Sequence, residues 1–174
     1  MVHADLQRCL DLIRASTAGL SPELAAQPVD GRWSVAEIVE HLKLAYSGTA
    51  KGLERCLEKG TPLAKPTTLR QQVRAFVVVT LGHFPEGVQA PKHIVPAGGV
   101  ALAELLDRLH GDLNRLDAAS VLVRDRFGSA KVLDHPILGG FSVDQWMRFH
   151  WIHTRHHNKQ IRSRRQVLER VTAL

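Results

Sequence analysis

The chain has 174 residues, a formal net charge of +6 and two cysteines, Cys9 and Cys56, which form no C-x-x-C pair. That length suits one domain, residues 1–174. The sequence shows neither a secretory signal pattern nor the roughly 20 apolar residues that span a bilayer. We therefore expect a single cytoplasmic domain with no membrane partner. The cysteine spacing excludes a zinc ribbon and a redox motif, and both thiols are predicted to be small buried side chains. Despite the positive charge, no groove-reading motif or set of interleaved aromatic residues indicates a specific nucleic-acid partner.

The first predicted element is an amphipathic helix over residues 3–18. Apolar residues recur at three-to-four spacing from Val2 to Ile13, which is the pattern of one buried helix face. Gly19, Pro22 and Pro28 then indicate that the helix ends and that a loop begins.

The second predicted helix is marked by its N-terminal capping residues. Ser34 is the expected N-cap, and Glu37, three residues later, is its capping-box partner. Trp33 and Ile38 occupy the two positions of a hydrophobic staple. The helix should continue to about Lys59, because a glycine and then a proline follow it.

The middle of the chain combines an ambiguous segment with an irregular one. Residues 76–80 are rich in β-branched side chains, as strands are, whereas Leu69, Val73 and Phe76 keep helical spacing, so we predict a short helix over residues 67–81. Residues 82–96 are rich in proline and glycine and are predicted to be irregular. A connection of that length usually has a function or is mobile.

Two further helices complete the predicted fold. Regularly spaced leucines predict a helix over residues 100–119, and an irregular stretch is expected over residues 127–140. The last helix begins like the second one, with Phe141 as the staple residue, Ser142 as the N-cap and Gln145 at the capping-box position. Helical periodicity with connections of mixed length predicts an all-α fold, a helical bundle.

The last helix has a basic face. At about 100° per residue this face lies opposite His153 and His157, so we predict that it is solvated. Its cations near the helix C-terminus also suit the negative end of the helix dipole. The face consists of Arg148, Arg155, Lys159 and Arg162.

The opposite face of the last helix carries a candidate metal site. His153 and His157 differ by about 40° in azimuth and about 6 Å in rise, which lets two imidazoles bind one ion. His150 lies on the same side and is a reserve ligand or a neighbour of the ligands, whereas His156 turns away and is predicted to be structural. Gln160 follows His157 by three residues and is placed to hydrogen-bond a bound water or a ligand.

A third ligand must come from another element, because two imidazoles leave a divalent ion under-coordinated. His41 is the best candidate, since it lies on the apolar stripe of the second helix and should face the core. Ala45, Gly48 and Gly52 follow on nearly the same face. Their small volume either leaves a hollow beside the ion or permits close helix packing.

These residues resemble a known superfamily. His41 in a capped second helix, followed by His153-x-x-x-His157-x-x-Gln160 in the last helix, resembles the DinB-like superfamily, and the likeness runs from about residue 5 to residue 165. One branch, known only as a domain of unknown function, is similar in two further segments, residues 84–92 and 135–146.

The resemblance implies a DinB-like four-helix bundle, here with an extra short helix and long loops. It also implies that His41, His153 and His157 bind nickel, zinc or iron(II), often in a homodimer. Some better understood members are thiol-dependent transferases or isomerases that activate a small thiol at the metal. No residues of this chain map onto a thiol-binding pocket.

Three neutral imidazoles leave a divalent ion its full charge and at least one exchangeable position, which predicts Lewis-acid chemistry. Imidazole alone does not select among zinc, copper, nickel and iron. The leading hypothesis is a metal-dependent hydrolase or thiol-dependent transferase that acts on a small molecule. A non-catalytic metal-binding bundle is the alternative, and a DNA-damage or stress-associated protein is a weaker one. Glu37, Asp134 and His135 are the candidates for proton transfer.

Overall fold

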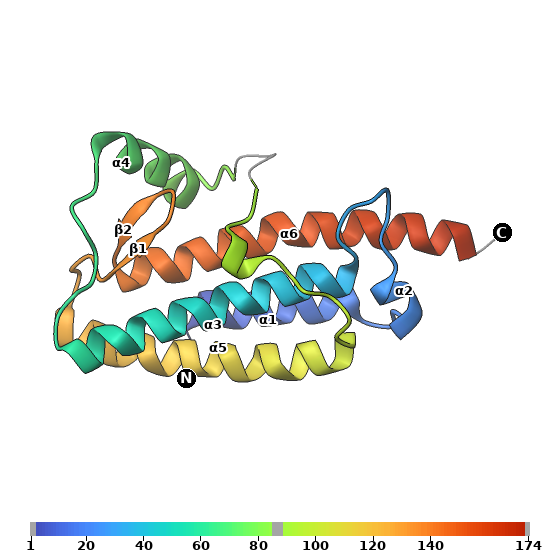
Figure 1. Cartoon of the computed structure of the whole chain (residues 1–174), viewed down its shortest axis with the longest axis horizontal. Coiled ribbons are helices and arrows are strands. Elements are labelled where there is room, and N and C mark those ends of the chain that lie inside the picture. Colours follow the sequence, from blue (N-terminus) through green and yellow to red (C-terminus); the bar gives the residue numbers. More distant parts are fainter. Residues whose placement is uncertain (1–2, 85–88, 173–174) are drawn as a thin grey trace.

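The computed structural model describes residues 3–84 and 89–172, so Val2 and residues 85–88, on which parts of the sequence predictions fall, lie outside the described residues. The longest helices lie side by side (Figure 1). α3 packs along α5, α1 packs along α6, and α3 also contacts α6. The predicted all-α fold is confirmed. These helices are α1 (Ala4–Thr17), α3 (Val35–Lys59), α5 (Leu102–Phe127) and α6 (Val143–Thr172).

Both predicted capping patterns are present. At the start of α3, Ser34 Oγ accepts the Glu37 N–H at 3.2 Å, and Glu37 Oε2 accepts the Ser34 N–H at 2.7 Å. At the start of α6, Ser142 and Gln145 form the same reciprocal pair at 3.4 and 3.1 Å. These bonds satisfy N–H groups that a helix start leaves without partners, which explains why both helices begin where the sequence predicted.

Two short helical segments lie where the sequence predicted irregular chain. α2 (Pro22–Ala26) follows the first helix, because Ser21 Oγ accepts the Leu24 N–H at 3.3 Å and a proline suits the first turn of a helix. The second segment, η2 (Lys92–Ile94), is a 3-10 turn within the proline-rich segment. The expectation of a loop was therefore wrong at both places, and η2 becomes important for the histidine site.

The predicted helix over residues 67–81 is confirmed, with a change of register inside it. α4 (Leu69–Ala75) continues into the π-helical turn η1 (Phe76–Thr80). The residues that gave the helical spacing are exposed, at 76% for Leu69 and 58% for Val73, whereas Val78 and Val79 of η1 are buried. The segment is thus attached to the core through the β-branched run and not through the predicted stripe.

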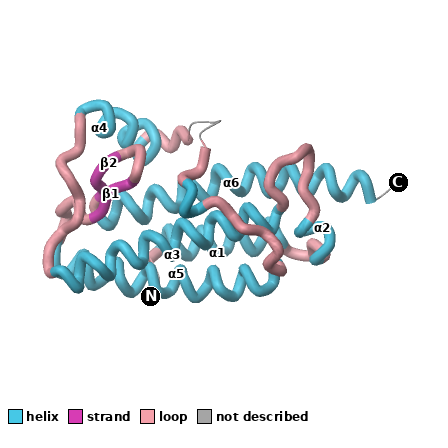
Figure 2. The backbone as a smooth tube through the Cα atoms, viewed as in Figure 1, coloured by secondary structure: helices cyan, strands magenta, loops and turns pink. Residues whose placement is uncertain are grey.

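The chain between α5 and α6 forms a small hairpin. Strand β1 (Leu133–His135) pairs antiparallel with β2 (Gly139–Phe141), drawn in magenta in Figure 2. A Cβ on Gly139 would lie 2.5 Å from Thr67 Cγ2, and its φ is 81°, so only glycine fits this close approach. The expectation of irregular chain here was wrong because the hairpin depends on this tertiary contact.

The apolar core fills the space between the long helices. α5 runs eight residues beyond the predicted end at Ala119, because Ser120 and Val123 continue its buried stripe. Cys9 and Cys56 are buried and free, as predicted. None of the helices in the described ranges combines the length and the apolar character that a membrane span needs. The largest fully buried side chains include Leu6, Ile13, Ile38, Leu42, Tyr46, Leu53, Leu105, Leu109, Leu113, Leu116, Phe141 and Met147.

Candidate metal centre

Three buried histidines from two helices converge at one point. α3 supplies His41, and α6 supplies His153 and His157. His153 Nε2 lies 3.2 Å from His41 Nε2 and 3.0 Å from His157 Nε2. Ligand nitrogens of a tetrahedral zinc ion lie about 3.4 Å apart, given metal–nitrogen bonds of about 2.1 Å. These two separations are slightly shorter than that value, and the ligand atoms of the three residues all lie within 4.8 Å of one another, so the group could hold one ion.

Hydrogen bonds orient two of the three rings. His41 Nδ1 donates to the Ile94 carbonyl oxygen of η2 at 2.8 Å, and His157 Nδ1 donates to Gln160 Oε1 at 2.9 Å. Because the proton of each ring is then on Nδ1, the lone pair of each Nε2 points into the cluster. The described residues offer no hydrogen-bond partner to His153 Nδ1, which is buried. One imidazole N–H cannot satisfy two facing lone pairs, whereas a cation would take a lone pair from all three rings.

The surroundings keep these histidines neutral. Burial lowers the pKa of His157 to about 3, with a further decrease from the positive charge that His41 can carry. Burial also lowers the pKa of His41 below its ordinary value and that of His153 well below it. Neutral imidazole is the form that binds metal ions, so the cluster is ready to bind one without first losing protons at neutral pH.

His150 and Gln160 occupy different places around the cluster. His150 is fully buried, and its Nε2 hydrogen-bonds Thr49 Oγ1 at 3.1 Å, so this ring stands beside the cluster and is not one of the three converging rings. Gln160 connects His157 to His156, because its Nε2 donates to His156 Nε2 at 3.1 Å. Gln160 is thus the group that fixes the His157 ring, and His156 holds Gln160 in place.

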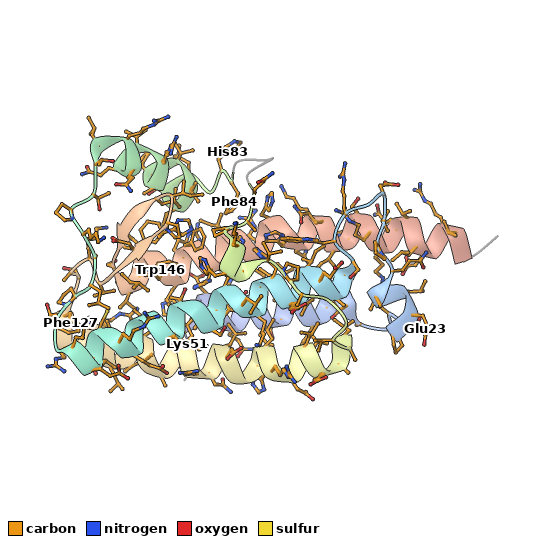
Figure 3. The ribbon with its side chains drawn as sticks, in the orientation of Figure 1. Glu23, Lys51, His83, Phe84, Phe127 and Trp146 are labelled. Atoms are coloured by element: carbon orange, nitrogen blue, oxygen red, sulfur yellow. The ribbon has the colours of Figure 1, made fainter. Side chains whose placement is uncertain are left out.

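The histidine cluster forms part of the wall of a cavity of about 700 Å³. A Cβ on Gly48 would meet no atom within 4 Å, whereas a Cβ on Gly52 would lie 2.3 Å from Leu133 Cδ2. Of the two alternatives for the small residues on α3, the hollow is found at Gly48. At Gly52 the chain packs closely, but against Leu133 of the hairpin and not against another helix. Aromatic rings provide much of the remaining wall, among them Phe84 and Trp146, which are labelled in Figure 3.

The candidates for proton transfer differ in their positions. Glu37 is held in the capping box and is not among the residues that line the cavity. Asp134 lines it and accepts the Lys65 N–H at 3.1 Å. His135 also lines it; its Nδ1 accepts the N–H groups of Ile137 and Leu138, both at 3.2 Å. Burial lowers the pKa of His135 to about 4, so it is a neutral ring with its proton on Nε2.

Three cationic residues of the cavity wall were not predicted from the sequence, namely Arg32, Arg55 and Arg164. Arg32 precedes α3, and Arg164 lies two turns beyond His157 on α6. The position of Arg164 was predictable, because it follows His157 by seven residues and its side chain therefore leaves the helix within about 20° of the same direction. The signal for Arg32 was absent, because its position depends on the path of the loop.

The fold and the cluster define an all-α protein with a buried three-histidine group that could hold a metal ion. The chain belongs to the family described as "Protein of unknown function (DUF1569)", whose model matches residues 7–164. That match includes all three histidines and agrees with the expectation of a family of unknown function, while the place of this family within the DinB-like superfamily stays a prediction. No curated protein and no solved structure matches the chain.

Proposed function

We propose that the protein is a metal-dependent enzyme that acts on a small molecule, with His41, His153 and His157 as the metal ligands. The observation that carries this proposal is the convergence of three neutral, buried Nε2 atoms on the wall of a cavity. A site that only stabilised the fold would be closed on all sides, whereas enzymes leave one coordination position open to a substrate. The cavity of about 700 Å³ is large enough for a small organic molecule.

A divalent ion bound there supplies Lewis acidity, which polarises a substrate oxygen or acidifies a water or a thiol. The chain itself supplies orientation and proton positions. Gln160 and the Ile94 carbonyl hold two ligand rings, and the neutral His135 offers an Nε2 hydrogen in the same cavity wall. Hydrolysis and thiol-dependent transfer are the two reaction classes that we propose, with nickel, zinc or iron(II) as the metal.

Metal content tests the first part of the proposal. The purified, untagged chain should contain about one divalent ion, and the double variant His153→Ala, His157→Ala should contain almost none, because one imidazole cannot retain the ion. Elemental analysis measures both. The matched control is His110→Ala, which removes an exposed histidine of α5 and should leave the content unchanged. A content far below one ion per chain, or equal contents in all three proteins, would contradict the proposal.

A second candidate function is structural, because an ion bound to His41 of α3 and to two histidines of α6 would crosslink these helices. Cobalt substitution separates the two functions. In an enzyme, azide or a small thiol should shift the visible cobalt bands, since the open position exchanges its ligand. A cobalt spectrum that no added ligand changes, together with loss of folding on chelation, would favour the structural role. The homodimer stays a prediction that sedimentation can test.

A further inference from the structure

One face of α6 connects the histidine cluster to a buried arginine. His153, His157 and Arg164 follow one another at intervals of four and seven residues, which places them within about 40° of one direction on the helix. All three line the cavity of about 700 Å³. Along the helix axis, the backbone of Arg164 lies about 10 Å from that of His157 and about 16 Å from that of His153.

Arg164 is buried without a carboxylate partner. The residue is 7% exposed, and its Nε makes a long bond of 3.4 Å to the Trp33 carbonyl oxygen. In the described parts of the chain, no carboxylate lies within ion-pair distance of Arg164. A guanidinium has five N–H groups, and buried arginines are nearly always paired. This side chain therefore has donors to offer to a group from outside the chain.

A second arginine strengthens the positive field at the same place. Arg32 lines the cavity beside Arg164. Burial lowers the pKa of Arg164, and repulsion from Arg32 lowers it further, while Asp30 opposes the shift from a distance beyond an ion pair. Two cations with one distant carboxylate leave an excess of positive charge, which an anion would neutralise.

A neighbouring cavity is also lined by cationic side chains. Its volume is about 870 Å³, and it shares Arg32, Gln160 and Arg164 with the first cavity. Arg155 and Lys159 add two more cations to its wall, and no Asp or Glu among the described residues lines it. The two arginines thus line both cavities, and the positive potential there would attract an anion.

We propose that Arg164 and Arg32 bind the anionic group, a carboxylate or a phosphate, of the small molecule that reacts at the metal centre. The inference rests on the proposed function, because it names the substrate class of that enzyme. Planar guanidinium groups bind both of these anions through two parallel hydrogen bonds. The substrate then carries its anionic group at a distance from its reacting group, because Arg164 follows the metal ligands by two to three turns of α6.

The test is an NMR titration of the full, zinc-loaded chain with inorganic phosphate and, separately, with acetate, which distinguishes the two anion types. Arg164→Gln should weaken binding of the preferred anion by about tenfold or more, since charge-assisted hydrogen bonds are lost. Arg32→Gln should weaken it by a smaller factor, and because Arg32 is exposed its removal leaves the core intact. The matched control is Arg162→Gln, an exposed cation of α6 that lines neither cavity and should change the affinity less than about twofold.

Metal content, measured on the same samples, separates this inference from the proposed function. If both arginine variants keep their metal and bind both anions as well as the original chain does, the anion site is wrong and the proposed enzyme stands. If the chain holds no metal but binds an anion through Arg164, the anion site is right and the metal enzyme is wrong. If phosphate shifts the cobalt bands equally in the original chain and in Arg164→Gln, phosphate binds the metal, and the anion site is again wrong.

Discussion

α3 contacts its two neighbouring helices in different ways. Toward α5 it packs along most of its length, and two ion pairs join the helices at the edge. Arg115 lies 2.5 Å from Glu54, and the half-buried Lys43 lies 3.7 Å from Asp112. Toward α6 the links are hydrogen bonds between polar rings and hydroxyl groups, and a cavity opens beside them. These links are His41–His153, Tyr46–Thr154 and Thr49–His150.

Stability and the candidate metal chemistry therefore depend on different sides of α3. Apolar burial between α3 and α5 supplies most of the free energy of folding at this contact, and the ion pairs at its edge add less. Between α3 and α6, polar groups and empty space replace apolar contacts, which lowers stability but makes room for an ion and a small molecule. Substitutions on the two sides of α3 should therefore affect different properties.

The largest expected effect is in the apolar region. Leu109→Ala on α5 removes a fully buried side chain and should lower the free energy of unfolding by about 2–5 kcal/mol, because it leaves a cavity. Urea denaturation measures this change, and the metal content should stay the same. Leu122→Ala, at a 56% exposed leucine of the same helix, is the control and should change stability by less than about 0.5 kcal/mol. If Leu109→Ala folds completely but loses its metal, the apolar contact between α3 and α5 and the metal centre are not independent.

A smaller effect is expected at the two glycines of α3. Gly52→Ala should destabilise the protein by about 1–2 kcal/mol, because the new methyl group forces Leu133 to move. Gly48→Ala points into open space and should stabilise α3 by up to about 1 kcal/mol, since alanine favours helix more than glycine does. Thermal unfolding of both variants checks the prediction. Adding Leu133→Ala should relieve the effect of Gly52→Ala, and equal shifts at both glycines would show that the cavity does not extend to Gly48.

The smallest expected effect on stability is at Arg164 of α6. Arg164→Met removes a cation that has no carboxylate partner and is repelled by Arg32, and should raise the free energy of unfolding by up to about 1 kcal/mol, because the repulsion between the two guanidinium groups is lost. Arg162→Met, on the exposed face, should leave it within about 0.5 kcal/mol. Urea denaturation in phosphate-free buffer compares the two variants. A loss of stability in Arg164→Met would mean that this guanidinium supports the fold and has an intramolecular role.

Much of the candidate site was predictable because helices have a fixed geometry. The rotation of about 100° per residue already separated His153 and His157 from the basic face and from His156. Capping residues indicated where α3 and α6 begin, and the spacing of their apolar residues indicated which faces turn inward. His41 was reachable through its place on an apolar stripe, although only the fold shows that it meets the α6 pair.

The positions of the four long helices follow from the sequence, apart from the last two turns of α5, since capping and apolar spacing act between residues a few positions apart. The short segments α2 and η2 were not predicted. The hairpin depends on tertiary structure, because it needs the approach of Thr67 to Gly139, which lie 72 positions apart in the sequence. The same holds for the partner of His150, which is Thr49 on another helix. Tertiary structure also decided that Gly48 faces a hollow while Gly52 meets Leu133. The physical reason is that packing contacts and cavities arise from residues far apart in the chain, so no local pattern of residue types encodes them.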